Sequence, residues 1–206
     1  MTRTILLVTL LAAILSMLPS TTPSWGQTPV CSFPACNATA SDANENTAGG
    51  TDALHSVVTS GSPQGFSNTA LGHRALFGNT SGPANTAIGN LTLSSNTTGP
   101  FNTAVGANAL THNVTGSGNT AMGVNALRDN VSGAGNAAFG NNALIHNTAS
   151  GNAAFGSNAL SDNTTGTNNA ACGGGALGSN DSGSSNTATG AGALSVNLTG
   201  NLNTEA

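Results

Sequence analysis

Apolar and polar positions along this chain repeat at a fixed interval. The string Asn-[Thr/Ala]-Ala-X-Gly, in which X is usually apolar, begins at Asn68, Asn85, Asn102, Asn119, Asn136, Asn152, Asn169 and Asn186, with a partial copy at Asn203. The interval is 17 residues throughout, except for one interval of 16. Because a unit of this length is too small to bury a face alone, the period predicts a solenoid whose coils stack on their neighbours.

Each unit is too short for two helices and a turn, but it accommodates two strands of about four to five residues joined by turns. Strand alternation turns the string's Ala one way and the residues on either side of it the other way, and the glycine permits a tight bend. A degenerate earlier copy begins at Asn46. We therefore predict an all-β parallel β-solenoid or β-roll over residues 46–206, with residues 27–45 as an N-terminal cap or linker.

Two apolar columns arise when equivalent residues stack at about 4.8 Å per coil. The leucine column contains Leu54, Leu76, Leu93, Leu110, Leu127, Leu144, Leu160, Leu177 and Leu194. The X column contains the interface candidates Leu71, Ile88, Val105, Met122, Phe139 and Phe155, followed by Cys172 and Thr189. We expect one column to fill the coil and the other to face a partner. Since each coil buries few large side chains, the pattern favours a homo-oligomer, most simply a trimer.

An asparagine column marks the predicted turns. It contains Asn79, Asn96, Asn113, Asn130, Asn147, Asn163, Asn180 and Asn197, each followed three residues on by Gly except after Asn147, where the unit is one residue short. Asn and Gly tolerate the positive φ that such turns require, and amides one coil apart can form a hydrogen-bonded ladder. Several of these asparagines also form glycosylation sequons, but their regular recurrence favours turn chemistry.

The position before this asparagine places His112, Asp129, His146 and Asp162 on neighbouring coils. Imidazole and carboxylate groups can share a cation or a proton, which makes the column a candidate metal site or pH-sensitive ladder. The alternative, which the sequence favours, is a solvated turn edge with weak charge pairing. We expect no bound cofactor.

The N-terminus is typical of a secretory signal. A short positive region precedes the apolar stretch from Ile5 to Leu18, which is too short to span a bilayer comfortably. We expect a cleavable signal over residues 1–26, with an uncleaved anchor as the alternative. An exported chain can keep a disulfide, and Cys31 and Cys36 are the candidate pair. The expected location is therefore secreted or at the cell surface.

Composition argues against an ordinary globular enzyme and against a nucleic-acid partner. The 206 residues include only 3 Lys+Arg and 7 Asp+Glu, with a formal net charge of -4. Arg3, Arg74 and Arg128 are too few to form the basic stripe that neutralises a phosphate backbone. No nucleophile elbow, metal-binding helix or phosphate loop occurs in the sequence, so we expect no catalysis.

The recurring [Ser/Thr]-Ala-X-Gly unit, the Ala-Leu segment and the Asn/Gly turns resemble the head repeats of bacterial trimeric autotransporter adhesins from about Asn46 to Ala206. They are also similar to repeats in tail-fibre-like proteins. The resemblance implies a left-handed parallel β-roll in each chain, three rolls packed together, and a surface-exposed rod that binds host or environmental ligands.

This chain departs from that pattern in two ways. The head repeats of the adhesins are commonly shorter than the 17 residues found here, and this chain shows neither a heptad stalk nor a C-terminal membrane-barrel anchor. The sequence stops inside a repeat, so we expect either a truncated form of a longer protein or an end that meets another subunit.

The predicted function is a structural or adhesive rod, with a fibre-type virion or tail protein segment as an alternative. A further alternative is an ice- or carbohydrate-surface binder, because a regular threonine column can match a regular ligand. That column contains Thr69, Thr86, Thr103, Thr120, Thr187 and Thr204, and it is interrupted by Ala137, Ala153 and Ala170. The insertion between Leu54 and Asn68 and the His73-Arg74 pair depart from the repeat and are minor site candidates.

Overall fold

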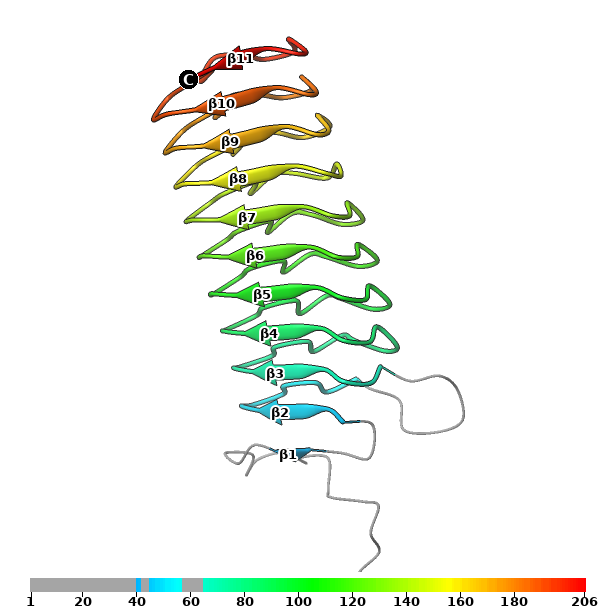
Figure 1. Ribbon diagram of the computed structural model, residues 1–206. Helices are drawn as coiled ribbons and strands as arrows, with labels where there is room; N and C mark the ends of the chain where they lie inside the picture. Colours follow the sequence, from blue (N-terminus) through cyan, green and yellow to red (C-terminus); the bar gives the residue numbers. More distant parts are fainter. Residues whose placement is uncertain (1–39, 42–44, 57–64) are drawn as a thin grey trace, which may run out of the picture.

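A computed structural model shows the chain as a rod of stacked coils that rise in sequence order from one end to the other (Figure 1). The structure describes residues 40–41, 45–56 and 65–206. The expected signal over residues 1–26 and the candidate disulfide between Cys31 and Cys36 lie outside the described residues.

One short strand per coil builds a single sheet whose strand order follows the chain. The strands are β1 (Ala40–Ser41), β2 (Thr47–Gly49), β3 (Thr69–Leu71), β4 (Thr86–Ile88), β5 (Thr103–Val105), β6 (Thr120–Met122), β7 (Ala137–Phe139), β8 (Ala153–Phe155), β9 (Ala170–Cys172), β10 (Thr187–Thr189) and β11 (Thr204–Glu205). β1 pairs antiparallel with β2, and every later neighbour pair is parallel, with equivalent repeat positions in register. The predicted parallel β-solenoid of 17-residue coils is confirmed.

The repeated coils have one strand of three residues, not the two strands of four to five residues that the sequence predicted. The Ala-Leu segment is a turn, because Leu110 has a φ of 51° and Asn108, two residues earlier, has a φ of 59°. Two left-handed residues this close together interrupt an extended strand. The positive φ recurs at the leucine of each coil from Leu54 to Leu194.

Burial and hydrogen bonds hold each leucine in this conformation. Leu110 is fully buried, its N–H donates to the Ala126 carbonyl at 3.0 Å, and its own carbonyl accepts from the Asn113 N–H at 3.1 Å. A left-handed backbone costs about 1–2 kcal/mol, whereas burying a leucine side chain contributes about 1.5–3 kcal/mol. Burial therefore offsets the backbone strain coil by coil.

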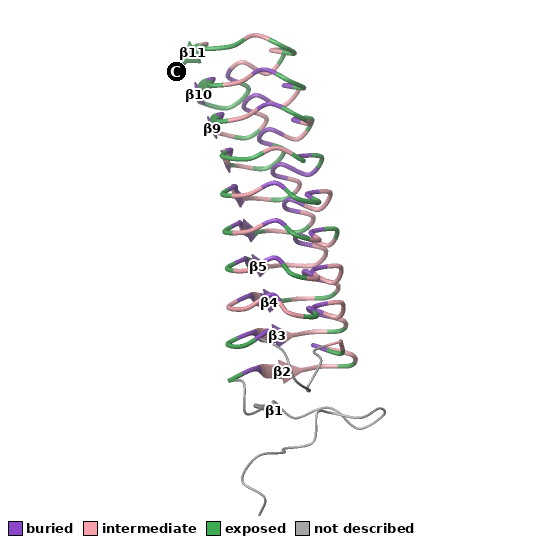
Figure 2. Ribbon diagram, turned by 90° about the vertical axis from the view of Figure 1, so that its right-hand side faces the viewer, coloured by how far each residue is buried: buried purple, intermediate pink, exposed green. Residues whose placement is uncertain are grey.

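The interior of the rod is a narrow column of alanine, leucine and asparagine side chains. In one coil Ala104, Ala109 and Leu110 are fully buried together with Asn102 and Asn113, and buried segments recur at the same place in successive coils (Figure 2). Of the two apolar columns, the leucine column is the one that fills the coil, and its members from Leu54 to Leu177 are buried. In the coil nearest the C-terminus, Leu194 is only partly buried.

Two glycine positions allow the coils to approach one another. Gly89 has a φ of 136°, and a Cβ atom there would lie 2.8 Å from the Gly106 carbonyl of the next coil. Gly99, in the turn after Asn96, does not have a positive φ, but a Cβ atom there would overlap the Gly116 carbonyl. The sequence argument that this Asn and Gly supply positive φ is therefore wrong. The asparagine fills the interior, and the glycine leaves room for the neighbouring coil.

Candidate functional site

The outward face of the sheet carries the X column. In β4, Ala87 is buried inside the coil while Thr86 and Ile88 lie on the opposite face, as the alternation predicted. Ile88, Met122 and Phe155 are 39%, 42% and 45% exposed. All six predicted interface candidates lie on this face, namely Leu71, Ile88, Val105, Met122, Phe139 and Phe155, and each is at least partly exposed.

The X column forms an apolar stripe free of charged side chains. No Asp, Glu, Lys, Arg or His occurs in the strands from β3 to β10. On β7 and β8 the rings of Phe139 and Phe155 stack with centroids 4.9 Å apart and planes 8° apart. Beyond them the column continues with Cys172, which is free and exposed, and Thr189. The stripe is therefore a surface suited to contact with another apolar surface.

Two histidines of the histidine–aspartate column contact the carboxylate of Asp129. His112 Nδ1 lies 3.1 Å from Asp129 Oδ1, and His146 Nδ1 lies 2.9 Å from Asp129 Oδ2. Arg128 Nε and Nη2 donate to the same two oxygens, each at 2.8 Å. Asp162, the fourth predicted residue, makes no side-chain contact with this group. The sequence analysis did not include Arg128 in this group. Its position next to Asp129, in a chain with only 3 Lys+Arg, could have indicated that it belongs there.

Arg128 has the largest effect on the Asp129 carboxyl. Its hydrogen bonds hold the pKa of the Asp129 carboxyl well below the ordinary range, hydrogen bonds to His146 and His112 lower it further, and partial burial opposes the shift. Four hydrogen bonds occupy the acceptor positions of the carboxylate.

The cluster lies on an exposed turn edge. The two histidine side chains are 55% and 47% exposed. Among the residues that the structure describes, no group of three or more His, Cys, Asp or Glu side chains is arranged to hold a metal ion. The contacts of the cluster are hydrogen bonds and an ion pair at a partly solvated surface.

The turn asparagines form the predicted ladder inside the rod. Asn96 Nδ2 donates to Asn79 Oδ1, and Asn113 Nδ2 donates to Asn96 Oδ1, both at 2.8 Å. Each amide also bonds the carbonyl of the glycine three residues on, as Asn96 does with Gly99 at 3.0 Å. The side chains from Asn79 to Asn180 are fully buried, so their sequons are inaccessible to glycosylation in the folded protein, whereas Asn197 in the C-terminal coil is only partly buried.

Two further asparagine rows were missed by sequence reasoning. Inside the rod, the Asn102 N–H donates to Asn85 Oδ1 at 2.8 Å, and this pattern continues along the string's first asparagine. Outside it, a row of amides bonds one coil to the next through Asn108, Asn125, Asn142 and Asn158 at 3.0–3.2 Å. Both rows recur with the repeat, and this recurrence was the signal that could have revealed them.

The His73-Arg74 pair does not form a joint site. The Arg74 guanidinium lies 4.2 Å from the centroid of the Phe77 ring. The same ring stacks on the His55 ring, with the two centroids 5.0 Å apart. His73 is exposed and its Nδ1 lies 3.1 Å from Asn90 Nδ2. The two side chains therefore belong to different contacts, and most of the preceding insertion lies outside the described residues.

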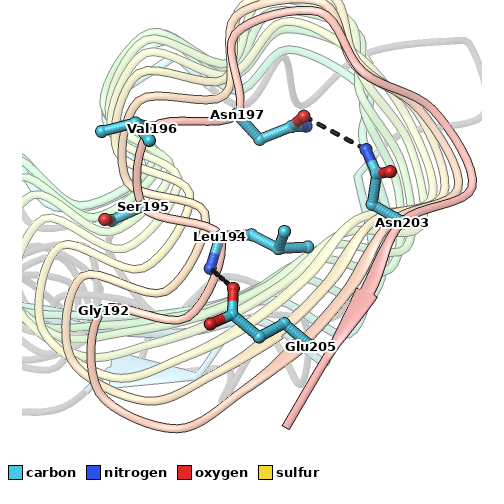
Figure 3. Close-up of a pocket in the computed structure, with 7 residues that line it drawn as sticks. All are labelled: Gly192, Leu194, Ser195, Val196, Asn197, Asn203 and Glu205. Carbon is cyan, nitrogen blue, oxygen red and sulfur yellow. Dashed lines mark hydrogen bonds between the residues drawn. The ribbon is translucent and has the colours of Figure 1, made fainter.

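A hollow of about 480 Å³ opens at the C-terminal coil (Figure 3). Its lining residues are Gly192, Leu194, Ser195, Val196, Asn197, Asn203 and Glu205. Leu194, Asn197 and Asn203 point into it, and Glu205 accepts a hydrogen bond from the Leu194 N–H at 2.7 Å. Leu194, Asn197 and Asn203 belong to the interior columns of the repeat, so the hollow is the interior of this coil seen from its end.

Comparison of the chain with protein-family models, curated proteins and solved structures finds no match. In the described part of the chain, no helix has the length and apolarity needed to cross a bilayer.

Proposed function

We propose that this protein is a secreted or surface-exposed structural and adhesive rod, without catalytic activity, that assembles as a homotrimer through the X column. The observation that carries the proposal is the charge-free apolar stripe from Leu71 to Phe155 on the outside of a regular sheet. Contiguous exposed apolar surface marks interaction sites, and the cores of interfaces are depleted in charged residues. The likeness to trimeric adhesin head repeats supports three copies.

The shape of the stripe favours parallel copies in register. Each coil offers one large outward side chain beside a small one, such as Phe139 beside Ala137 on β7. Around a rotation axis parallel to the rod, every X residue would meet its own counterparts at the same height. Such an axis would bury the whole stripe at once, whereas a shifted or crossed arrangement would bury only part of it.

Cys172 allows a direct test of this geometry, because it is a free, exposed member of the X column. In a chain carrying Cys31→Ser and Cys36→Ser, mild oxidation should join two of three subunits through Cys172. The matched control carries Cys172→Ser with Ser182→Cys, an exposed position away from the strands, and it should remain uncoupled. Equal coupling of both variants would contradict contact through the X column.

Light scattering tests the number of chains. The exported chain should have the mass of a trimer, and Met122→Asp should reduce it to a monomer by placing a carboxylate in the contact. Val124→Asp is the control, since Val124 lies in the same coil with 45% exposure but outside the strand. A monomeric parent protein would refute the trimer.

Export and adhesion need their own measurements. N-terminal sequencing of the protein recovered outside expressing cells should begin at Gln27 or within a few residues of it. Beads coated with the full exported chain should be retained under flow on polysaccharide, extracellular-matrix or polystyrene surfaces more strongly than albumin-coated beads. If beads coated with the chain are retained no more strongly than albumin-coated beads on all three surfaces, the adhesive function is excluded and only the structural function remains.

The threonine column supports a second candidate function, an ice- or carbohydrate-surface binder. Thr69, Thr86, Thr103 and Thr120 lie in register on the outward face of β3 to β6. A regular row of hydroxyls can match a regular surface. Thermal hysteresis that disappears in Thr103→Leu/Thr120→Leu, but persists in Thr98→Leu/Thr115→Leu outside the strands, would support this function. No effect of the parent protein on ice growth would exclude the ice-binding form.

A further inference from the structure

One junction between coils lacks its link in the turn-asparagine ladder, although the Asn136 N–H still donates to Asn119 Oδ1 across it at 2.9 Å. The Asn147 amide donates to the Ala149 carbonyl at 2.8 Å and makes no bond to Asn130, whose Oδ1 is buried without a hydrogen-bond partner. At the other described steps of this column, from Asn79 to Asn197, the amide-to-amide bond forms at 2.7–3.0 Å. The ladder is therefore interrupted between the coils that contain Asn130 and Asn147.

The interruption follows from a missing residue. The coil formed by residues 136–151 is one residue shorter than its neighbours, and the residue absent is the one between Thr148 and Ala149. Backbone pairing at this corner is lost as well. The Val114 N–H bonds the Val131 carbonyl at 2.8 Å, but the Val131 N–H makes no equivalent bond to the next coil.

The same junction is bridged on the outside of the rod. Asp129 and His146 immediately precede Asn130 and Asn147, and His146 Nδ1 lies 2.9 Å from Asp129 Oδ2. Arg128 engages both oxygens of this carboxylate at 2.8 Å, which fixes its orientation toward the histidine. The outer contact therefore joins the two coils between which the inner contact is absent.

We infer that Asp129 and His146, oriented by Arg128, form an external clasp that replaces the interior amide link lost at the short coil. In a stack whose coils contact only their neighbours, stability is set junction by junction, and the weakest junction opens first. The clasp keeps the coils on either side of this junction in one cooperative unit. This inference is independent of the proposed adhesive function.

The molecule contains a matched control for the clasp. His112 bonds the same carboxylate at 3.1 Å across the preceding junction. There the interior link is intact, since Asn130 Nδ2 donates to Asn113 Oδ1 at 3.0 Å. His112 and His146 are similarly exposed and share one partner, so they differ chiefly in the junction that they bridge.

The test is hydrogen exchange of the full chain, measured by mass spectrometry for the parent protein, His146→Ala and His112→Ala. Loss of one net hydrogen bond at the weakest junction should accelerate exchange of the amides of residues 136–151 about tenfold in His146→Ala. In His112→Ala the amides of residues 102–118 should change less than about twofold, because that junction still holds its interior bonds. Equal effects of the two substitutions would overturn the clasp.

A restored coil gives a second, independent measurement. Inserting Ser between Thr148 and Ala149 together with Ala149→Gly recreates the 17-residue unit. In this background the interior link should form, and His146→Ala should then affect exchange no more than His112→Ala does. A tenfold effect of His146→Ala that persists in the restored coil would show that the contact does not compensate for the missing link.

Discussion

Asn113 donates its side-chain amide to the side-chain carbonyl of Asn96 at 2.8 Å, and both side chains are fully buried. The interior of the rod is therefore partly polar. From Asn96 to Asn197, every turn amide except that of Asn147 is bonded to the coil before it and to the glycine of its own turn. Buried polar groups are tolerated when their hydrogen bonds are satisfied, and an identical residue in every coil satisfies them repeatedly.

Loss of one amide from this ladder should be costly. Asn113→Ala deprives Asn96 Oδ1 of its donor and Asn130 Nδ2 of an acceptor, and we expect the free energy of unfolding in urea to fall by about 3 kcal/mol. Asn125→Gly, in the partly exposed outer row, keeps the φ of 59° without strain and should cost about 1 kcal/mol or less, because water can replace its bonds. Similar losses in the two variants would contradict the importance of the buried ladder.

Two leucines test the left-handed backbone of the leucine column. Leu110→Ile keeps the side-chain volume but places a β-branched residue at a φ of 51°, so we expect a loss of about 3 kcal/mol in unfolding free energy. Leu71→Ile makes the same exchange in an extended strand and should be neutral within about 0.5 kcal/mol. Thermal unfolding of both variants provides the comparison, and equal tolerance would mean that the turn adapts freely.

The glycine after the turn asparagine should be irreplaceable for reasons of space. A Cβ atom on Gly99 would overlap the Gly116 carbonyl and lie 2.6 Å from Asn96 Oδ1, so Gly99→Ala should lower stability by about 3 kcal/mol. Gly118 has a φ of 64° but open space around it, and equivalent positions hold Ala84 and Phe101. Gly118→Ala should therefore cost about 1 kcal/mol at most. Circular dichroism during urea unfolding distinguishes the two.

Stability should depend on the charge of Asp129 in a defined direction. The folded protein holds the pKa of this carboxyl below the ordinary value of 3.8. Its contribution is therefore present above that value and is lost as pH falls through the lower folded pKa. Asp129→Asn should be less stable than the parent protein at pH 7, and the difference should narrow as pH falls below about 4.

Urea unfolding at pH 7, 4 and 2.5 measures this dependence. Asp162→Asn is the control, because Asp162 makes no side-chain contact with the cluster, and it should remain within about 0.5 kcal/mol of the parent protein. A gap between Asp129→Asn and the parent protein that stays constant over this range would show that the carboxylate charge does not contribute.

Much of the architecture was predictable from the repeat. The 17-residue period predicted stacked parallel coils, and alternation around Ala87 correctly separated the buried alanine from Ile88 on the outer face. The sequence also indicated two apolar columns, of which the leucine column, from Leu54 to Leu177, is the interior one. The amide ladder followed from asparagines at equivalent positions.

The sequence by itself determined the period, the register and the sorting of side chains into columns, because these depend only on which residues recur at equivalent places. The tertiary structure alone decided the cross-section of the coil: the left-handed Leu110, the three-residue strand, and the buried Asn113 with its glycine. It also decided that Arg128 joins His146 on one carboxylate. Backbone angles and side-chain partners of this kind are set by contacts with the coils above and below, which a position in the repeat does not specify.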